Sequence, residues 1–588
     1  MFRQNTKNGF VVKGYQGDAK TLLAFNLSKP KSSKLAGFSI ACKPGTGDTY
    51  YLLNNLHFSD ASGHAQDKLE PANSTLNNPI QKFRWVHVPG NYHQNGKPFF
   101  GQYTYTVTPR YFDKDDHLLA IDPSLSVQVS IDVKPFAKGK VSLGFTRGFV
   151  QSQAFTHHFG NKALFKPKNE LVFKTTEKAG TDNNGNAYTF EDEYAWSGFT
   201  ARQVIYNLIQ EVMADKTLSL DVEAYDFNEP VIFTDFIELA RQKRIRIILD
   251  NASLHHNAKN PKAEDQFETK FRAAFTNKTE ADQHIKRGHF ARFQHNKVFI
   301  VKKGSTPVKV LTGSTNFSIT GIYVNSNHVL VFEDSAVAQK YSDAFNEAWQ
   351  TNLNNGQFST SPIATGTPTF NGTGMPAMNI SYSPHTDSFS FKRLKDISDR
   401  VGKEKSSVLF AVMDTDETVK GPISKTLKNL HAKQDVFSYG ITDSKSNIFL
   451  YKPDSGSGIK VTGLPGQTIL PKPFDSEKSI SIGHQVHHKF IVCGFNTPGA
   501  VVWCGSSNLA QGGEDENGDN LIEIKDQDIA TVFAIEAFAL VDHFLFRDKF
   551  GAKKKNAKSK PLILADDDSW ADKYFDKKDM YCQDRELF

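Results

Sequence analysis

The sequence predicts an α/β protein in which two similar αβ lobes, each a mixed sheet covered by helices, follow an all-β sandwich domain. Two observations lead to this fold class. Apolar and polar residues alternate along roughly the first 135 residues, and a strand, loop, strand unit occurs twice later in the chain. With 588 residues the chain is several times longer than a typical domain, so we expect several packed units rather than one continuous core.

The N-terminal region has the pattern of short strands separated by turns. Period-two alternation appears in 101–112, GQYTYTVTPRYF, and again in 124–133, SLSVQVSIDV. One apolar and one polar face are typical of a half-buried antiparallel sheet. We expect a β-sandwich of immunoglobulin or fibronectin size that serves as an accessory or positioning module, with partner or carbohydrate binding as the alternative. The apolar face of the second segment holds Leu125, Val127, Val129, Ile131 and Val133.

From about residue 190 helical and strand-like segments alternate. Apolar residues recur at helical spacing between Val204 and Val212, and they are followed by a strand at 218–227, a helix, and an apolar strand that ends at Asp250. Strand, helix and strand in this order indicate a parallel or mixed sheet covered by helices. We divide the chain into a sandwich (1–137), a linker (138–190), a first lobe (191–352), a linker (353–385), a second lobe (386–550) and a C-terminal tail (551–588).

An internal repeat relates the two lobes. Segments 295–321 and 487–513 align without a gap. His295 stands eighteen residues before Gly313, and His487 stands eighteen residues before Gly505. Because identical spacing in two copies is hard to obtain by chance, we expect two structural repeats that pack about a pseudo-twofold axis and share one site.

Each copy begins with a histidine and a lysine two positions apart, HNK and HHK, and continues with GSTN or GSSN. On a strand, residues two apart project from the same face. A histidine can act as a nucleophile or proton shuttle, a lysine supplies positive charge for phosphate oxygens, and hydroxyl and amide groups supply further donors. The candidate catalytic residues are His295 and His487, and the candidate phosphate-binding residues are Lys297, Lys489, Asn316, Asn508, Ser314 and Ser506.

The pattern HxK followed by GSxN, in two copies across residues 190–550, resembles the phospholipase D superfamily. The segments GFTRGFVQSQAF, LDVEAYDF, NGDNLIEI and DRELF are also similar to a bacterial branch that carries an N-terminal β-domain. The resemblance implies a metal-independent phosphodiesterase that works through a phosphohistidine. It also implies that His295 is the nucleophile and His487 the general acid, with the reverse order as the alternative.

One feature departs from the family pattern, which continues as HxKxxxxD. Lys302 and Gly494 occupy the two aspartate positions. In the family this aspartate has a supporting role, so we expect the chemistry to survive its loss. A carboxylate in the segment after GSSN can accept a hydrogen bond from a catalytic imidazole instead, and Asp519 is the best candidate. The alternative is that Asp519 is an ordinary turn residue.

Three functions compete. The first is hydrolysis or transfer of phospholipid head groups, favoured because both motifs lie in one long chain, and it would require peripheral membrane contact. The second is a nuclease acting on DNA or RNA, favoured by the net charge of +6 and the lysine-rich run at 551–560. The third is a binding or scaffold protein without turnover, which the missing aspartates motivate.

The remaining composition predicts neither a metal nor a cofactor. Cys42, Cys493, Cys504 and Cys582 form no CxxC pair and no zinc-ligand spacing, so we expect reduced, buried thiols. No apolar run is long enough to cross a bilayer. The first residues lack the pattern of a secretory signal, so we expect a cytoplasmic monomer, with non-classical export as the alternative.

Overall fold

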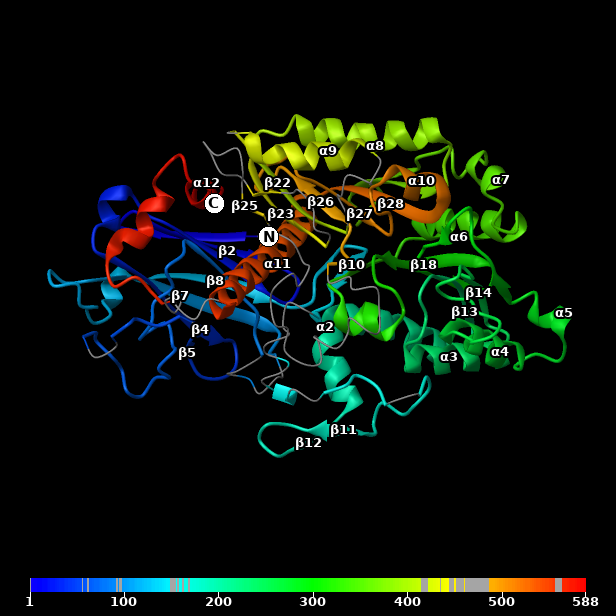
Figure 1. Cartoon of the computed structure of the whole chain (residues 1–588), viewed down its shortest axis with the longest axis horizontal. Helices are drawn as coiled ribbons and strands as arrows, with labels where there is room; N and C mark the ends of the chain where they lie inside the picture. The colour runs from blue at the N-terminus through cyan, green and yellow to red at the C-terminus, as the bar shows by residue number, and fades with distance from the viewer. Residues whose placement is uncertain are drawn as a thin grey trace.

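The structure is a computed structural model that describes most of the chain. Residues 1, 55, 61–62, 91–93, 95–97, 149–154, 156–157, 161–162, 168–169, 414–420, 434, 444–448, 451–458, 461–485 and 556–562 are not described. The lysine-rich run at 551–560 therefore lies in part outside the described residues. Figure 1 shows the β-rich N-terminal region, in blue, at one end of the molecule and the first αβ lobe, in green, at the other. The predicted α/β class with an N-terminal β-region is confirmed.

The N-terminal region is built from two four-stranded sheets that share one apolar core. Residues alternate between buried and exposed along β8, as predicted, because one face packs on the other sheet. Leu125 is the exception, since it lies in the short helix η2 (Pro123–Leu125) rather than on the strand. The first sheet contains β1 (Phe2–Lys7), β2 (Phe10–Gln16), β3 (Thr21–Asn26) and β6 (Arg84–His87), and the second contains β4 (Leu35–Pro44), β5 (Tyr50–Tyr51), β7 (Gly101–Tyr111) and β8 (Val127–Val133).

The first lobe contains a mixed sheet in the order β15-β14-β13-β17-β18-β19-β10-β9. Strand β13 pairs parallel with β14 and antiparallel with β17. Strand β10 comes from the segment that we assigned to a linker, and it joins the sheet because its alternate residues are apolar and buried. The strands are β9 (Ala137–Lys138), β10 (Val141–Phe145), β13 (Leu218–Ala224), β14 (Ile245–Leu249), β15 (Ile285–Arg287), β17 (Val298–Lys303), β18 (Thr306–Gly313) and β19 (His328–Phe332).

Helices cover the sheet of the first lobe, as the apolar spacing predicts. Helix α2 begins with a capping box between Thr189 and Asp192, and it buries Ile205, Leu208 and Val212. Helix α3 begins at a proline, which suits the first helical turn. The helices of this lobe are α2 (Phe190–Ala214), α3 (Pro230–Arg241), α4 (Ala263–Arg272), α5 (Lys278–Ala281), α6 (Ser335–Gln350) and α7 (Asn355–Ser359).

The second lobe repeats this plan in the order β20-β21-β28-β27-β26-β22-β23. Strand β22 pairs parallel with β23 and antiparallel with β26, which matches β13 with β14 and β17. Cys493 and Cys504 are buried and reduced in β26 and β27, as predicted. The elements are β20 (Thr369–Phe370), β21 (Ala377–Ser383), α8 (Asp387–Gly402), β22 (Ser407–Val412), α9 (Pro422–Asn429), β23 (Phe437–Thr442), β26 (Phe490–Cys493), β27 (Val501–Gly505), α10 (Gln511–Glu516), β28 (Asn517–Lys525) and α11 (Gln527–Lys555).

The two lobes are joined through backbone pairing near both repeated motifs. The short strand β16 (Phe293–Gln294) of the first lobe pairs parallel with β28 of the second. A single bridge links Ser326 to Val486 in the same way, and the amide of His487 donates to the carbonyl of Ser326 over 3.0 Å. These pairings lie immediately before His295 and His487, so the lobe interface fixes where the two motifs meet.

The C-terminal residues 563–588 pack against the sandwich, although we assigned them to a tail (Figure 1). Trp570, in η7 (Asp568–Tyr574), lies 5.7 Å from the ring of Phe83 and donates its Nε1–H to the carbonyl of Leu35 over 2.8 Å. Helix α12 (Met580–Glu586) follows it. Large aromatic rings bury enough apolar surface to order such a short segment.

No helix in the described part of the chain combines the length and the apolar character that crossing a bilayer requires. The longest, α11, is interrupted by charged residues along its 29 positions.

Replacing Trp570 with alanine should destabilise the sandwich. The side chain is 8% exposed, and its removal leaves a cavity and an unpaired carbonyl, so we expect a loss of about 3–5 kcal/mol in the free energy of unfolding. Urea unfolding followed by circular dichroism measures this loss. The control is Leu69→Ala, because Leu69 is 95% exposed. Equal midpoints for the two variants would contradict the packing described above.

Candidate active site

The two histidine-lysine motifs meet at the interface between the lobes. Each motif lies in an extended segment that ends just before its strand, β17 or β26, rather than on the strand as predicted. All four side chains are buried. His295 and His487 are each 5% exposed, and Lys297 and Lys489 are each 1% exposed.

His295 is held by a carboxylate from the opposite lobe. Its Nδ1 lies 2.8 Å from Oδ1 of Asp519, on β28. The backbone amide of Asp519 donates to the hydroxyl of Ser383 over 3.1 Å, which fixes this strand end. With Nδ1–H donating to the carboxylate, Nε2 carries the lone pair. Burial raises the pKa of Asp519 to about 7.

His487 is held in the same way, but by an amide. Its Nδ1 lies 2.8 Å from Oδ1 of Asn327 and 3.0 Å from the carbonyl oxygen of Ser314. The Asn327 amide donates its Nδ2–H to the carbonyl of Gly321 over 2.8 Å, so its oxygen faces the histidine. Both neighbours of Nδ1 are acceptors, which places a proton on Nδ1.

Asn327 was missed by the sequence analysis, although a signal for it exists. It follows Gly313 by fourteen residues, and Asp519 follows Gly505 by the same number. The repeat therefore includes residues beyond GSxN, and Asn327 and Asp519, which orient the two histidines, occupy equivalent positions in it.

The two lysines bring positive charge into this buried interface. Lys489 Nζ lies 2.9 Å from the carbonyl of His487 and 3.3 Å from Nε2 of the same residue. Lys297 donates to the carbonyl of His295 and stands over the ring of Tyr225, 4.8 Å from its centroid. Burial lowers the pKa of Lys297 to about 7, and burial together with Lys297 lowers the pKa of Lys489. Desolvated cations of this kind attract a bound anion strongly.

The GSxN segments contribute in two ways. Ser314 donates its hydroxyl to Oδ1 of Asn327 over 2.8 Å, and Ser506 accepts from the amide of Asn520 over 3.0 Å. Ser314 therefore supports Asn327, which binds His487, and Ser506 supports Asn520, the residue next to Asp519. Within the described structure, Oδ1 of Asn316 and Oδ1 of Asn508 are buried and have no hydrogen-bond partner, so these two oxygens can accept a hydrogen bond from a ligand or from water.

Glycine is required where each GSxN segment begins. A Cβ on Gly313 would lie 2.3 Å from the carbonyl oxygen of His328, and a Cβ on Gly505 would lie 2.4 Å from that of Asn520. Any side chain would push apart the strands that carry the orienting residues.

The middle residues of the motifs also bind across the lobe interface. Asn520 donates its Nδ2–H to Oδ1 of Asn296 over 2.9 Å. At the equivalent place in the other half, Nδ1 of His328 lies 3.2 Å from Nδ1 of His488. Every position of both motifs thus contributes either to the buried site or to the contacts that hold it together.

The missing aspartates are replaced by other ion pairs. Lys302 binds Asp221 on the neighbouring strand over 2.7 Å, and Asp221 also accepts two hydrogen bonds from Arg246. Gly494 begins the turn after β26, and a Cβ there would lie 3.5 Å from the ion pair between Arg400 and Glu404.

Comparison with known proteins gives one family match. Residues 209–349 match the family described as "Cardiolipin synthase, PLD-like domain". No curated protein matches the chain.

Several solved structures are similar in part. Polyphosphate kinase from Porphyromonas gingivalis is 11% identical, with a TM-score of 0.37 over 63% of this chain and 52% of that one, so the chain spans about half of that enzyme. Phosphatidylserine synthase from Haemophilus influenzae is 9% identical, with a TM-score of 0.38 over 58% and 84%. The phospholipase D family member Nuc from Salmonella typhimurium is 19% identical, with a TM-score of 0.20 over 25% and 86%.

We expect His295 to stay neutral at pH 6. Burial first, and then the charges of Lys297 and Lys489, hold its pKa well below the ordinary value near 6.5. ¹⁵N-histidine NMR measures its protonation, with His295→Gln to assign the signal. Lys489→Met should raise this pKa because one repelling charge is removed. An imidazolium signal from His295 in the wild type at pH 6 would contradict the described electrostatics.

Proposed function

We propose that this chain is a phosphodiester-cleaving enzyme of the phospholipase D superfamily, with one active site shared by its two lobes. A single observation carries the proposal. Each histidine has its Nδ1 engaged by a side chain of the opposite lobe, Asp519 for His295 and Asn327 for His487, beside two buried lysines. Two imidazoles with fixed tautomers beside an anion site suit nucleophilic and acid-base chemistry at phosphorus.

The difference between the orienting groups supports His295 as the nucleophile. A ring that attacks phosphorus through Nε2 becomes positively charged in the phosphohistidine. The Asp519 carboxylate stabilises this charge through Nδ1–H, as a carboxylate does for a catalytic imidazolium. Asn327 offers a neutral carbonyl to His487, which leaves that ring better suited to donate a proton.

The reaction has two steps. Nε2 of His295 forms a bond to phosphorus as the bond to the leaving oxygen breaks, and that oxygen takes the Nε2 proton of a doubly protonated His487. Neutral His487 then removes a proton from water or an alcohol. The resulting oxygen attacks phosphorus, and the bond to His295 breaks. Both histidines return to their starting states.

The phosphate is held by this chain's own groups. Lys297 and Lys489 offset the charge of the phosphate oxygens, and the side-chain amides of Asn316 and Asn508 donate hydrogen bonds to them. Ser314 and Ser506 act indirectly through the residues they bind. Because two desolvated ammonium groups provide the electrostatic stabilisation, the reaction requires no metal.

Phospholipid head groups are the favoured substrate, by hydrolysis or by transfer to an alcohol. The family model that matches the first lobe carries the name of cardiolipin synthase, which supports a lipid phosphodiester. Such a substrate implies peripheral contact with a lipid surface.

Activity should depend on both histidines and survive a chelator. We expect the wild type to hydrolyse bis(p-nitrophenyl) phosphate in EDTA. His295→Ala should lose at least about 10³-fold in kcat/KM, and His487→Ala should lose at least about 10³-fold in kcat, because it hydrolyses the intermediate slowly. His289→Ala is the control, because this histidine lies outside the site and binds Asn251. Parallel assays with phospholipid vesicles and with DNA separate the substrate classes. Wild-type inactivity on all three substrates would favour a binding protein.

Trapping the intermediate distinguishes the two histidines. Nitrophenolate leaves without help from an acid, so His487→Ala should still form the adduct but hydrolyse it slowly. Mass spectrometry of the quenched protein should find His295 carrying a nitrophenyl phosphoryl group in this variant and no adduct in His295→Ala. Phosphorylation of His487 in His295→Ala would reverse the assignment.

The pH profile of kcat/KM should be bell-shaped with both limbs near pH 7. The pKa of Asp519 is raised to about 7, so activity rises with pH as its carboxylate forms. The pKa of Lys297 is lowered to about 7, so activity falls at higher pH as its positive charge is lost. Asp519→Asn should remove the acid limb and leave the basic one. An unchanged acid limb in that variant would show that another group controls it.

A further inference from the structure

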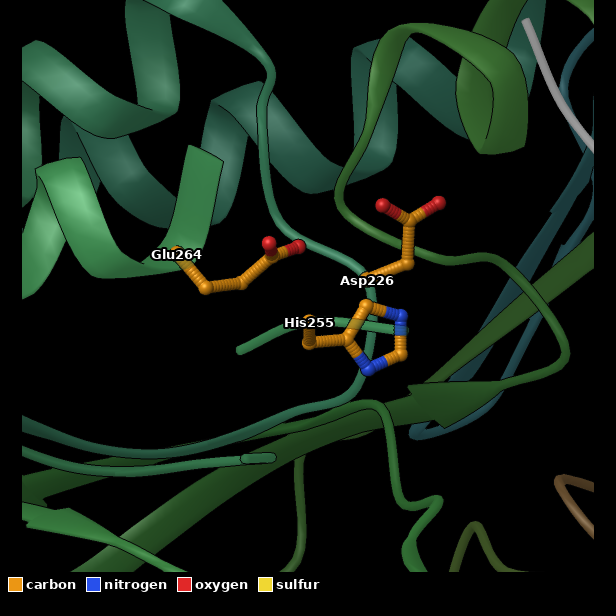
Figure 2. A group of neighbouring side chains, drawn as sticks. All are labelled: Asp226, His255 and Glu264. Atoms are coloured by element: carbon orange, nitrogen blue, oxygen red, sulfur yellow. The ribbon is translucent and has the colours of Figure 1, made fainter. Parts of the chain in front are cut away.

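A second cluster of polar side chains lies beside the active site in the first lobe. Asp226, His255 and Glu264 each offer one ligand atom, and these atoms all lie within 4.8 Å of one another (Figure 2). Figure 2 shows the carboxylate of Glu264 pointing toward Asp226, with a ring nitrogen of His255 on the same side. We call these three residues the acid-histidine cluster.

Each carboxylate of the cluster is anchored by one oxygen. Oδ2 of Asp226 accepts the hydroxyl proton of Ser318 over 2.6 Å, and Oε1 of Glu264 accepts the amide proton of Phe227 over 2.9 Å. Among the described residues, no hydrogen bond or ion pair joins the three members of the cluster to one another. The second oxygen of each carboxylate therefore forms no bond to the other two members of the cluster, and it can serve as a ligand atom.

His255 presents its other ring nitrogen to this space. Its Nδ1 lies 2.8 Å from Oδ2 of Asp250, and its side chain is 9% exposed. With Nδ1–H donating to Asp250, the lone pair is on Nε2, and no described residue donates a hydrogen bond to it. Histidines that bind a metal through one ring nitrogen usually donate the N–H of the other ring nitrogen to a carboxylate, as Nδ1 does here.

We propose that the acid-histidine cluster binds one divalent transition-metal ion, Zn²⁺ or Mn²⁺. An imidazole nitrogen favours these ions over Mg²⁺ and Ca²⁺, while the carboxylates accept all of them. The ion would also offset the repulsion between two neighbouring carboxylates. Asp226 is only half-buried, which gives the ion a way in from solvent.

Short cysteine and histidine spacings did not predict a metal site, because the three ligands are far apart in the sequence. The three ligands come from three separate elements. Asp226 follows the end of β13, His255 lies in the segment after β14, and Glu264 is in the first turn of α4. The ion would therefore fasten three segments together at one edge of the active site.

Two contacts connect this site to the proposed nucleophile. The ring centroid of Tyr225 lies 4.3 Å from the ring centroid of His255 and 4.7 Å from that of His295. Asp250, which orients His255, also accepts the amide proton of Gln294 over 2.7 Å, one residue before His295. The ion would thus stabilise the segments beside His295, whereas His295 itself is oriented by Asp519, so the proposed chemistry continues without the ion.

Calorimetric titration of the full-length, chelator-treated, tag-free protein tests the proposal. We expect ZnCl₂ or MnCl₂ to bind at one ion per chain and to raise the melting temperature. Asp250→Asn should weaken binding about 10- to 100-fold through the lost support of His255, and Glu264→Gln and His255→Gln should weaken it more. Glu268→Gln on the same helix is the matched control, because that carboxylate binds Arg272 outside the cluster.

The melting temperature distinguishes a variant that has lost the metal ligand from one that does not fold. Melting temperatures in EDTA that match the wild type identify the variants that fold normally. Loss of one bound ion in Glu264→Gln or His255→Gln, with binding kept in Glu268→Gln, supports the proposal. The proposal is wrong if neither ion binds the wild type at one per chain, or if both ligand variants bind as the wild type does. Binding does not depend on catalysis, so an inactive enzyme would leave this result intact.

Discussion

Hydrogen bonds that cross between the lobes are the constraint on which the rest of the site depends. The Nδ1 atoms of His295 and His487 each bind a side chain of the other lobe, Asp519 and Asn327 respectively. Neither lobe alone contains an oriented histidine, so the site exists only when the two repeats pack together. The same bonds make the site asymmetric, because one acceptor is a carboxylate and the other an amide. A pseudo-symmetric fold can thereby assign different roles to two equivalent residues.

Burial strengthens the interactions between the charged groups of the site and shifts their pKa values. Lys297, Lys489 and Asp519 are each about 1% exposed, so their charges interact with one another more strongly than they would in water. Desolvation opposes each charge, and it moves the pKa values of Lys297 and Asp519 toward neutrality from opposite directions. In the proposed reaction, the phosphate oxygens would replace the lost hydration of the two lysines.

The N-terminal sandwich is part of the same packed structure. Arg84 on β6 binds Asp542 of α11 and Asp584 of α12, both over 2.7 Å. Lys20 forms an ion pair with Glu536 of α11, whose other oxygen lies 3.6 Å from Nε2 of His488. Ion pairs therefore connect the sandwich to helix α11, and Glu536 of that helix lies close to the middle residue of the second motif. This path supports a positioning role for the β-domain.

The sequence by itself determined the α/β class, the two repeats and the motif residues, because periodicity and spacing are local properties of the chain. The segment after GSSN suggested Asp519, and the spacing of fourteen residues in the repeat contained the information for Asn327. Only the tertiary structure decided which histidine faces a carboxylate, since that depends on contacts between residues more than 150 positions apart. It also decided the acid-histidine cluster and the packing of residues 563–588 on the sandwich. These features come from surfaces that meet only after folding, and no local pattern records them.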